Sequence, residues 1–402
     1  MCSLTSLKTN SKQRTMTIPK EFDDIRPFTP EEMQGAFDKL SDDKQFQAVV
    51  AKVFPGIPFE AIMHKARQCK TMLDFQKAFS YGIMQSIIDK HTDGTDVDFG
   101  TLDKTKNYTF LSNHRDIVLD SGFLSKLMLD NGFGNTVEIA IGNNLLVYPW
   151  INYLVRLNKS FIVKRNLHGR QKLLASQQLS GYMHFAIKEK KESIWIAQRQ
   201  GRSKDSDDRT QSSILKMMRL GGTGTIIERL QQLNIVPLSI SYEYDPCDYL
   251  KAKEFQQRRD NPEFQKSMQD DLESMSTGIF GYKGHVHYQA AACMNEWLGT
   301  LDGKQHKTEL YPVISEHIDH EIHSHYRLYA NNYIAYDHLN GNSRFANLYT
   351  KDEEDRFENY LKQQIGKINL PNPDLDYLEC CMLTMYSNPL KNYLAAAEAK
   401  QS

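Results

Sequence analysis

The sequence lacks several features that would assign it to a well-marked class of protein. No stretch of its 402 residues approaches the ~18 consecutive apolar residues that a membrane-spanning helix needs. Its six cysteines occur in no metal-binding spacing, and the adjacent pair Cys380–Cys381 is no disulfide framework. The chain has no Gly-x-Ser-x-Gly sequence, which excludes the nucleophile turn of the α/β-hydrolases.

An excess of positive charge is also missing. Lys plus Arg number 49 and Asp plus Glu 50, so net charge predicts no general attraction to nucleic acid. The first 16 residues, MCSLTSLKTNSKQRTM, are polar and lack the apolar segment of a secretory signal. We therefore expect a disordered tail over residues 1–20 and a reducing, cytoplasmic environment.

What is present is the pattern of a folded α/β protein. Residues 21–100 predict a helical region, and TPEEM within it supplies the cap Thr29 and a first-turn proline, Pro30. Over residues 105–245, five short apolar segments alternate with helix-compatible ones, at 108–112, 136–141, 160–163, 193–197 and 235–242. This alternation predicts a mixed, largely parallel sheet flanked by helices. Residues 246–402 predict a mostly helical addition, with a loop and strand at 281–288, while 91–100 reads as a loop.

The segment LSNHRDIVLD places His114 where the first core strand ends and a helix begins. Sheets of this type hold their sites beyond the carboxyl ends of strands. A carboxylate, at Asp116 or Asp120, would hold one ring nitrogen and leave the other to take a proton. The alternative is a surface histidine, with Asp116 placed favourably at a helix N-terminus.

Between Glu138 and Glu189 the chain has no acidic residue but several basic ones. Such a basic strip suits phosphate groups, or is a solvated face balanced by acids elsewhere. Within it, NNLLVYPWINYLVRLNK (143–159) has the composition of an element lying at a lipid surface or of a buried helix.

A second polar turn, QRQGRSKD, follows the strand at 193–197. It contains Arg199 and Arg202 around Gly201, which allows close approach of the backbone to a ligand. It is otherwise a charged loop. The histidine-rich segment 315–329 lacks the His-Glu-x-x-His spacing of a zinc site and predicts a polar helix surface.

Taken together and in this order, the segments resemble the motifs of the glycerolipid acyltransferase superfamily, which includes glycerol-3-phosphate and 1-acylglycerol-3-phosphate acyltransferases. The four matching segments, within residues 105–245, are SNHRDIVLD, SFIVKRNLHGR, RQGRS and NIVPLSISY. The resemblance implies transfer of a fatty acyl group from acyl-CoA or acyl carrier protein to a hydroxyl of glycerol 3-phosphate or lysophosphatidate. It implies phospholipid biosynthesis, peripheral contact with the inner face of a membrane, no metal and no resident cofactor.

The resemblance also implies residue roles. His114 would be the general base, oriented by Asp120 or Asp116. Seven residues would bind substrate: Lys164, Arg165, Arg170, Gln200, Gly201, Arg202 and Ser203.

Two positions depart from the family pattern. Five residues separate His114 from Asp120 where the family has four, and Arg199 or Gln200 stands where the third motif has Glu. These departures leave two alternatives open, a non-catalytic lipid- or phosphate-binding protein and an enzyme that acylates a lyso-aminolipid. A nucleic-acid binder is disfavoured because the basic strip offers no evident stacking platform.

Overall fold

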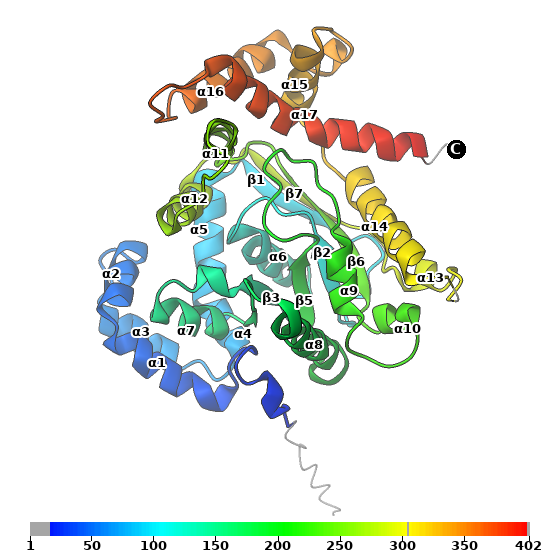
Figure 1. The fold of residues 1–402 in the computed structure, drawn as a ribbon. Coiled ribbons are helices and arrows are strands. Elements are labelled where there is room, and N and C mark those ends of the chain that lie inside the picture. Colours follow the sequence, from blue (N-terminus) through cyan, green and yellow to red (C-terminus); the bar gives the residue numbers. More distant parts are fainter. Residues whose placement is uncertain (1–16, 304, 400–402) are drawn as a thin grey trace, which may run out of the picture.

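A seven-stranded mixed sheet forms the centre of the protein (Figure 1). The computed structural model describes residues 17–303 and 305–399. The strands are β1 (Gly94–Asp98), β2 (Thr109–Ser112), β3 (Val137–Gly142), β4 (Ser160–Val163), β5 (Ser193–Ala197), β6 (Ile235–Tyr242) and β7 (His285–Ala290). Their order is β1-β7-β6-β2-β5-β3-β4, and every neighbouring pair is parallel except β6 and β7. The predicted fold class, a largely parallel α/β sheet with flanking helices, is confirmed.

All five strands predicted within residues 105–245 are present, and β7 overlaps the strand predicted near 281–288. The prediction of a loop over 91–100 was wrong, because β1 lies there. Its sequence, GTDVD, is polar and partly exposed, and it pairs with β7 alone at the edge of the sheet. An edge strand of this kind is stabilised by a partner about 190 residues away, which local sequence does not reveal.

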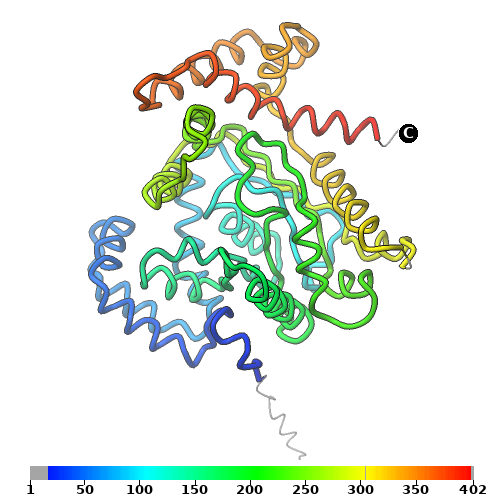
Figure 2. The backbone as a smooth tube through the Cα atoms, in the orientation of Figure 1, coloured from blue at the N-terminus to red at the C-terminus, as the bar shows by residue number. Residues whose placement is uncertain are grey.

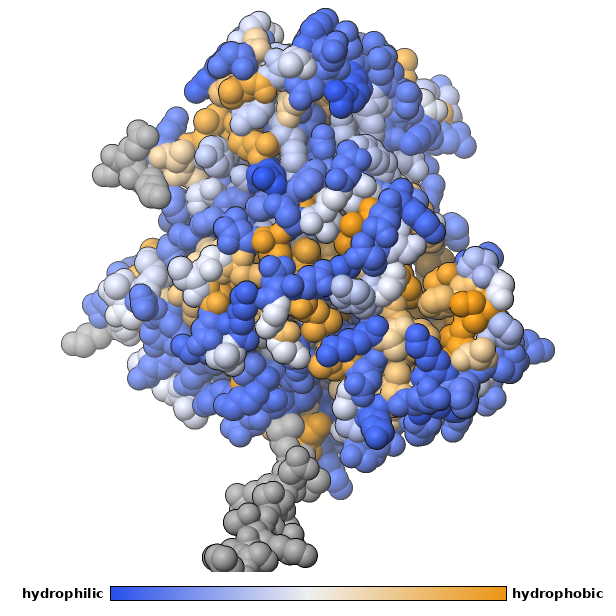
Figure 3. All heavy atoms as spheres, turned by 180° about the vertical axis from the view of Figure 1, so that it is seen from behind, coloured by the Kyte–Doolittle hydropathy of each residue, from blue (hydrophilic) through white to orange (hydrophobic). Residues whose placement is uncertain are grey.

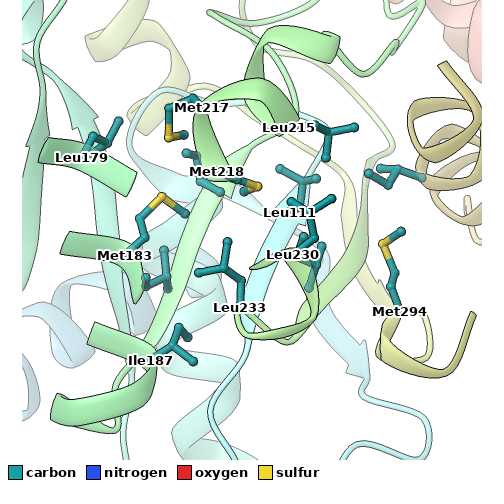
Figure 4. Packing of buried hydrophobic residues seen from close by; sticks show 14 of the residues in the cluster. Leu111, Leu179, Met183, Ile187, Leu215, Met217, Met218, Leu230, Leu233 and Met294 are labelled. Carbon is teal, nitrogen blue, oxygen red and sulfur yellow. The ribbon is translucent and has the colours of Figure 1, made fainter. Parts of the chain in front are cut away.

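Helices cover both faces of the sheet, so the strands alternate between two cores. Phe110 of β2 packs with α5 (Tyr81–His91) and α6 (Leu119–Asp130), whereas its neighbour Leu111 packs on the other side. That side is covered by α8 (Gly169–Phe185), α9 (Ser212–Met218), α10 (Ile226–Gln231) and α14 (Lys307–Ser324). Figure 4 shows Leu111 and side chains of α8 and α9 pointing into this second core.

The N-terminal helices form their own apolar cluster against the segment 143–159. They comprise η1 (Lys20–Phe22), η2 (Pro30–Glu32), α1 (Met33–Asp42), α2 (Lys44–Val53), α3 (Phe59–Arg67), α4 (Met72–Phe75) and η3 (Gln76–Ser80). Trp150 and Leu157 of α7 (Pro149–Leu157) pack into this cluster, so that segment is largely a helix facing protein. The tail predicted at 1–20 falls mostly outside the described residues.

The C-terminal helices form a layer beyond the sheet edge (Figure 2). These are α15 (Ala330–Asn340), η6 (Ala346–Leu348), α16 (Lys351–Ile365) and α17 (Leu375–Ala399). They join the rest of the chain through α11 (Asp248–Asp260) and α14, both of which contact α17. The shorter elements η4 (Asn143–Leu145), η5 (Ala186–Lys190) and α13 (Asn295–Leu298) complete the fold with α12 (Met268–Phe280). Across the described residues, we find no helix with the length and apolar character to cross a bilayer.

Candidate active site

His114 and Asp120 form a hydrogen-bonded pair at the carboxyl end of β2. His114 Nδ1 lies 2.7 Å from Asp120 Oδ2, and the same oxygen accepts the backbone N–H of Arg115 at 2.7 Å. The Asp120 side chain is fully buried, while that of His114 is 13% exposed. Since a carboxylate only accepts hydrogen bonds, Nδ1 carries the proton, and Nε2 has no hydrogen-bond partner among the described residues.

Asn113 holds the loop that presents His114. Its side-chain amide donates to the carbonyl of Ile240 at 2.9 Å and accepts the Ile240 N–H at 2.8 Å. The side chain thus takes the place of a backbone peptide beside β6, one residue after β2 ends. This explains why a buried asparagine precedes the histidine.

Asp116 lies apart from His114 and caps the next helix. Its Oδ1 accepts the backbone N–H groups of Val118 and Leu119 at 2.8 and 2.7 Å, which starts α6 at Leu119. The turn before α6 therefore absorbs the additional residue between His114 and Asp120. Burial and the nearby Asp120 charge raise the pKa of Asp116. Its Oδ2 lies only 2.0 Å from where a β-carbon on Gly278 would be, so α12 can approach this carboxylate only with glycine there.

Trp195 of β5 contacts the other side of the imidazole. The two rings meet edge to face, with centroids 5.5 Å apart and planes at 68°. Trp195 Nε1 donates to Ser112 Oγ at 3.0 Å, which fixes the indole. The His114 ring is therefore held by a carboxylate and an aromatic ring.

The residue after His114 forms a buried ion pair with Asp208. Arg115 Nη2 is 2.7 Å from Asp208 Oδ2, which also accepts the Tyr326 hydroxyl at 2.6 Å. Both charged side chains are at least nine-tenths buried. The ion pair ties the His114 loop to the loop after β5 and to the segment that follows α14.

His114 opens into a cleft of about 770 Å³. The cleft is lined from the carboxyl ends of four neighbouring parallel strands: His114 after β2, Asn144 after β3, Arg165 after β4 and the 199–209 loop after β5. This is where open α/β sheets place their ligands.

The outer wall of the cleft comes from α11, α12 and the segment between them. Contributors include Leu250, Phe255, Phe264 and the acidic residues Asp270 and Glu273. In Figure 1, α11 and α12 lie beside the strand ends, above the N-terminal helices. The sequence predicted helix here without assigning it a role in the site.

The substrate-binding residues predicted from the sequence divide into two groups. Arg165, Gln200, Gly201 and Arg202 line the cleft with His114. Gly201 has φ +75°, a backbone conformation that favours glycine.

The other three predicted residues do not line the cleft. Lys164 pairs with Asp24 and Gln178, Arg170 is exposed on α8, and Ser203 is buried and donates to Asp205 and the carbonyl of Asp207. Lys164 and Arg165 are consecutive residues after β4, but the Lys164 side chain pairs with Asp24 whereas that of Arg165 lines the cleft.

Among the described residues, three arginines of the cleft form no ion pair: Arg165, Arg199 and Arg202. Burial lowers the pKa of Arg165, and Arg202 has a buried Nη1 without a hydrogen-bond partner in the described part of the chain. Burial raises the pKa of the neighbouring Cys247 thiol to about 12, so this thiol stays protonated. The cleft therefore offers Arg165 and Arg199 to an anion, whereas Arg202 is also attracted by the carboxylates of Asp116 and Asp245.

A second, apolar cavity of about 310 Å³ lies between the N-terminal helices and α6. Val118, Ser121 and Gly122 of the segment around Asp120 line it, and so do Val49 and Val53 of α2. Ile117 lines the cleft and Val118 the cavity, so the loop after His114 contributes to both spaces. Figure 3 shows an apolar patch on the side of the molecule where α2 lies. Val49, Val53 and Ile57 are exposed there.

Sequence reasoning missed Trp195, Asp208 and the apolar cavity. Trp195 lies within a predicted strand, and only its position opposite His114 distinguishes it from a core residue. Asp208 lies in a charged loop whose other acids are partly exposed. The only sequence signal for the cavity is the apolar spacing of the N-terminal helices, which also predicts an ordinary core.

Comparisons with known proteins give little further information. Neither a scan against protein-family models nor a search of curated proteins finds a match. Among solved structures, the chain is similar to the 1-acyl-sn-glycerophosphate (LPA) acyltransferase PlsC from Thermotoga maritima. The TM-score is 0.37 and the identity 13%, over 72% of this chain and 93% of that one. This level of similarity does not establish a family.

Proposed function

We propose that this protein is an O-acyltransferase that moves a fatty acyl group from a thioester to a hydroxyl of an anionic lipid precursor. The observation that carries the proposal is the 2.7 Å pair of His114 and Asp120 at the wall of a cleft with free guanidinium groups. An alcohol is too weakly acidic to react unaided at neutral pH, so its proton must be removed as it attacks. A histidine with one nitrogen held by a carboxylate suits this task.

In the proposed reaction, His114 Nε2 takes the hydroxyl proton while the oxygen attacks the thioester carbonyl. The C–O bond forms, the C–S bond breaks, and the thiolate leaves with the proton that His114 had taken. Asp120 stabilises the imidazolium between these two events, and the indole of Trp195 faces the same ring. General-base assistance of this kind contributes about 10²–10⁴ to the rate.

The cleft and the apolar cavity suit the two parts of the substrates. The cleft, with Arg165, Arg199 and Arg202, would hold the phosphate of glycerol 3-phosphate or lysophosphatidate, and phosphates of acyl-CoA or of acyl carrier protein. The apolar cavity, which begins beside Asp120, would hold the acyl chain. Holding both partners in line reduces the barrier by several kcal/mol (about 7–11 kcal/mol at the most favourable).

The acceptor remains a choice between two classes. Gln200 supplies no charge where the resembled family has Glu, and α12 adds Asp270, Asp271 and Glu273 to the cleft wall. Arginines facing carboxylates would also suit a lyso-aminolipid that carries both signs of charge. Gln200 is likewise the observation that keeps a non-catalytic lipid-binding role as the second candidate.

The test is turnover by the purified chain with acyl-CoA and with acyl carrier protein as donors. Glycerol 3-phosphate, lysophosphatidate and lyso-aminolipids serve as acceptors, and products are identified by mass. We expect His114→Ala to reduce turnover at least a hundredfold while the protein stays folded, as its melting transition would show. His338→Ala, on the remote C-terminal helices, is the matched control. Full activity of His114→Ala would refute the proposal, and substrate binding without turnover by the wild type would favour the non-catalytic role.

A further inference from the structure

An apolar pair is exposed at the start of α8, the helix that follows the connection containing Arg165. Leu173 and Leu174 are 51% and 52% exposed, and they share one helix face with Arg170 and Gln177, which are exposed as well. Figure 1 draws α8 in the foreground. The outward face of a surface helix is normally polar. Two adjacent leucines there depart from this pattern.

Two cations lie near this pair, Arg170 on the same helix face and Lys172 on another face of the same turn. Arg170 and Lys172 are exposed and form no ion pair within the described residues. Lys164, at the start of the preceding loop, is bound to Asp24. Since the chain has no Asp or Glu from 139 to 188, the segment itself contains no compensating acid. The exposed set of Arg170, Lys172, Leu173 and Leu174 is called the α8 surface below.

We propose that the α8 surface docks on an anionic lipid bilayer, with the two leucines inserted among the headgroups and the cations bound to phosphates. The surface consists of about one and a half turns of one helix. A stable protein partner would instead bury about 800 Å² and 20–30 residues on each side. Leucines flanked by cations are the composition of elements that lie at a membrane interface.

Docking in this way places the cleft next to the lipid. Arg165, which lines the cleft, lies in the β4–α8 connection, five residues before Arg170 of the α8 surface. A lipid acceptor would then reach Arg165 from the bilayer without crossing water. This consequence rests on the proposed function, whereas the docking itself does not.

The experiment is co-sedimentation of the full chain with vesicles of phosphatidylcholine alone or with 30% phosphatidylglycerol (about one lipid in three). Leu173→Ser/Leu174→Ser should weaken binding to the anionic vesicles at least tenfold. Arg170→Gln/Lys172→Gln should weaken it about fivefold per cation and leave binding to neutral vesicles unchanged. The control is Leu348→Ser/Leu375→Ser, whose leucines are 49% and 59% exposed on the C-terminal layer, and it should bind as the wild type does.

The proposal is overturned if the wild type does not bind anionic vesicles, or if the Leu173/Leu174 variant binds them as the wild type does. It is also overturned if these variants lose binding to acyl carrier protein while vesicle binding persists. Melting temperatures establish that each variant is folded. Because vesicle binding is measured without turnover, its failure is distinguishable from failure of the acyltransferase proposal.

Discussion

Replacing Asp120 by asparagine isolates the contribution of one negative charge to the proposed reaction. Oδ2 accepts both hydrogen bonds, from His114 and from the Arg115 backbone, whereas Oδ1 has no hydrogen-bond partner among the described residues. An amide can therefore place its oxygen at the Oδ2 position and keep both bonds. Its NH₂ group then occupies the Oδ1 position, buried and unpaired, at a cost of about 1–3 kcal/mol in stability.

The expected effect of this substitution on the activation free energy is larger than its effect on stability. Two unit charges about 4 Å apart attract each other by about 4 kcal/mol at an effective dielectric constant of 20. The neutral amide of the Asp120→Asn variant cannot give this attraction to the imidazolium, so the acyl-transfer rate should fall about a thousandfold.

The assay is thiol release from acyl-CoA at saturating acceptor, with the melting temperature measured in parallel. His114→Ala should abolish the rate to a similar or greater extent, and the double variant should be no slower than His114→Ala. A folded Asp120→Asn variant with a rate within threefold of the wild type would refute the proposal that the Asp120 charge stabilises the imidazolium.

Three further predictions concern other parts of the structure. Asn113→Ala leaves the N–H and C=O of Ile240 without their side-chain partner, so the free energy of unfolding in urea should fall by about 2–4 kcal/mol; a loss below about 0.5 kcal/mol would contradict the role given to the amide. Ser125 lines the apolar cavity, and Ser125→Phe should lower the rate with palmitoyl-CoA relative to octanoyl-CoA about tenfold; an unchanged ratio would place the acyl chain elsewhere. Burial raises the pKa of Asp248 to about 7 from its ordinary 3.8. Because the folded state then holds this proton more tightly than the unfolded state, the free energy of unfolding should fall as pH rises from about 4 to about 7, by up to about 4 kcal/mol. Urea unfolding at pH 5 and pH 8 should show this fall in the wild type and a smaller one in Asp248→Asn; equal falls would assign it to other groups.

The order of elements around the site could be predicted from the sequence because local signals determine it. The five strands of residues 105–245 are short apolar runs ended by polar turns, and their alternation with helices predicts a parallel sheet. A parallel sheet aligns the carboxyl ends of its strands. The sequence therefore predicted that His114, Arg165 and Arg202 would lie at one edge, where the structure has them.

The partner of His114 could not be predicted in the same way. Asp116 and Asp120 are both close to it in sequence, and their positions depend on where α6 begins. Asp116 caps that helix with two hydrogen bonds, which leaves Asp120 in the first turn pointing back at the imidazole. Capping geometry involves backbone torsions, and residue spacing alone does not specify them.

The sequence by itself determined the five strands of residues 105–245, the position of His114 at a strand end and the local excess of basic residues. Only the tertiary structure decided which of those basic residues face the cleft. Lys164 forms an ion pair with Asp24, 140 positions earlier in the chain, whereas Arg165 forms no ion pair among the described residues. It also decided that α12 reaches Asp116 at Gly278 and that the N-terminal helices enclose an apolar cavity beside Asp120. These features depend on packing between segments far apart in the chain, and such packing leaves no periodic signal in either segment.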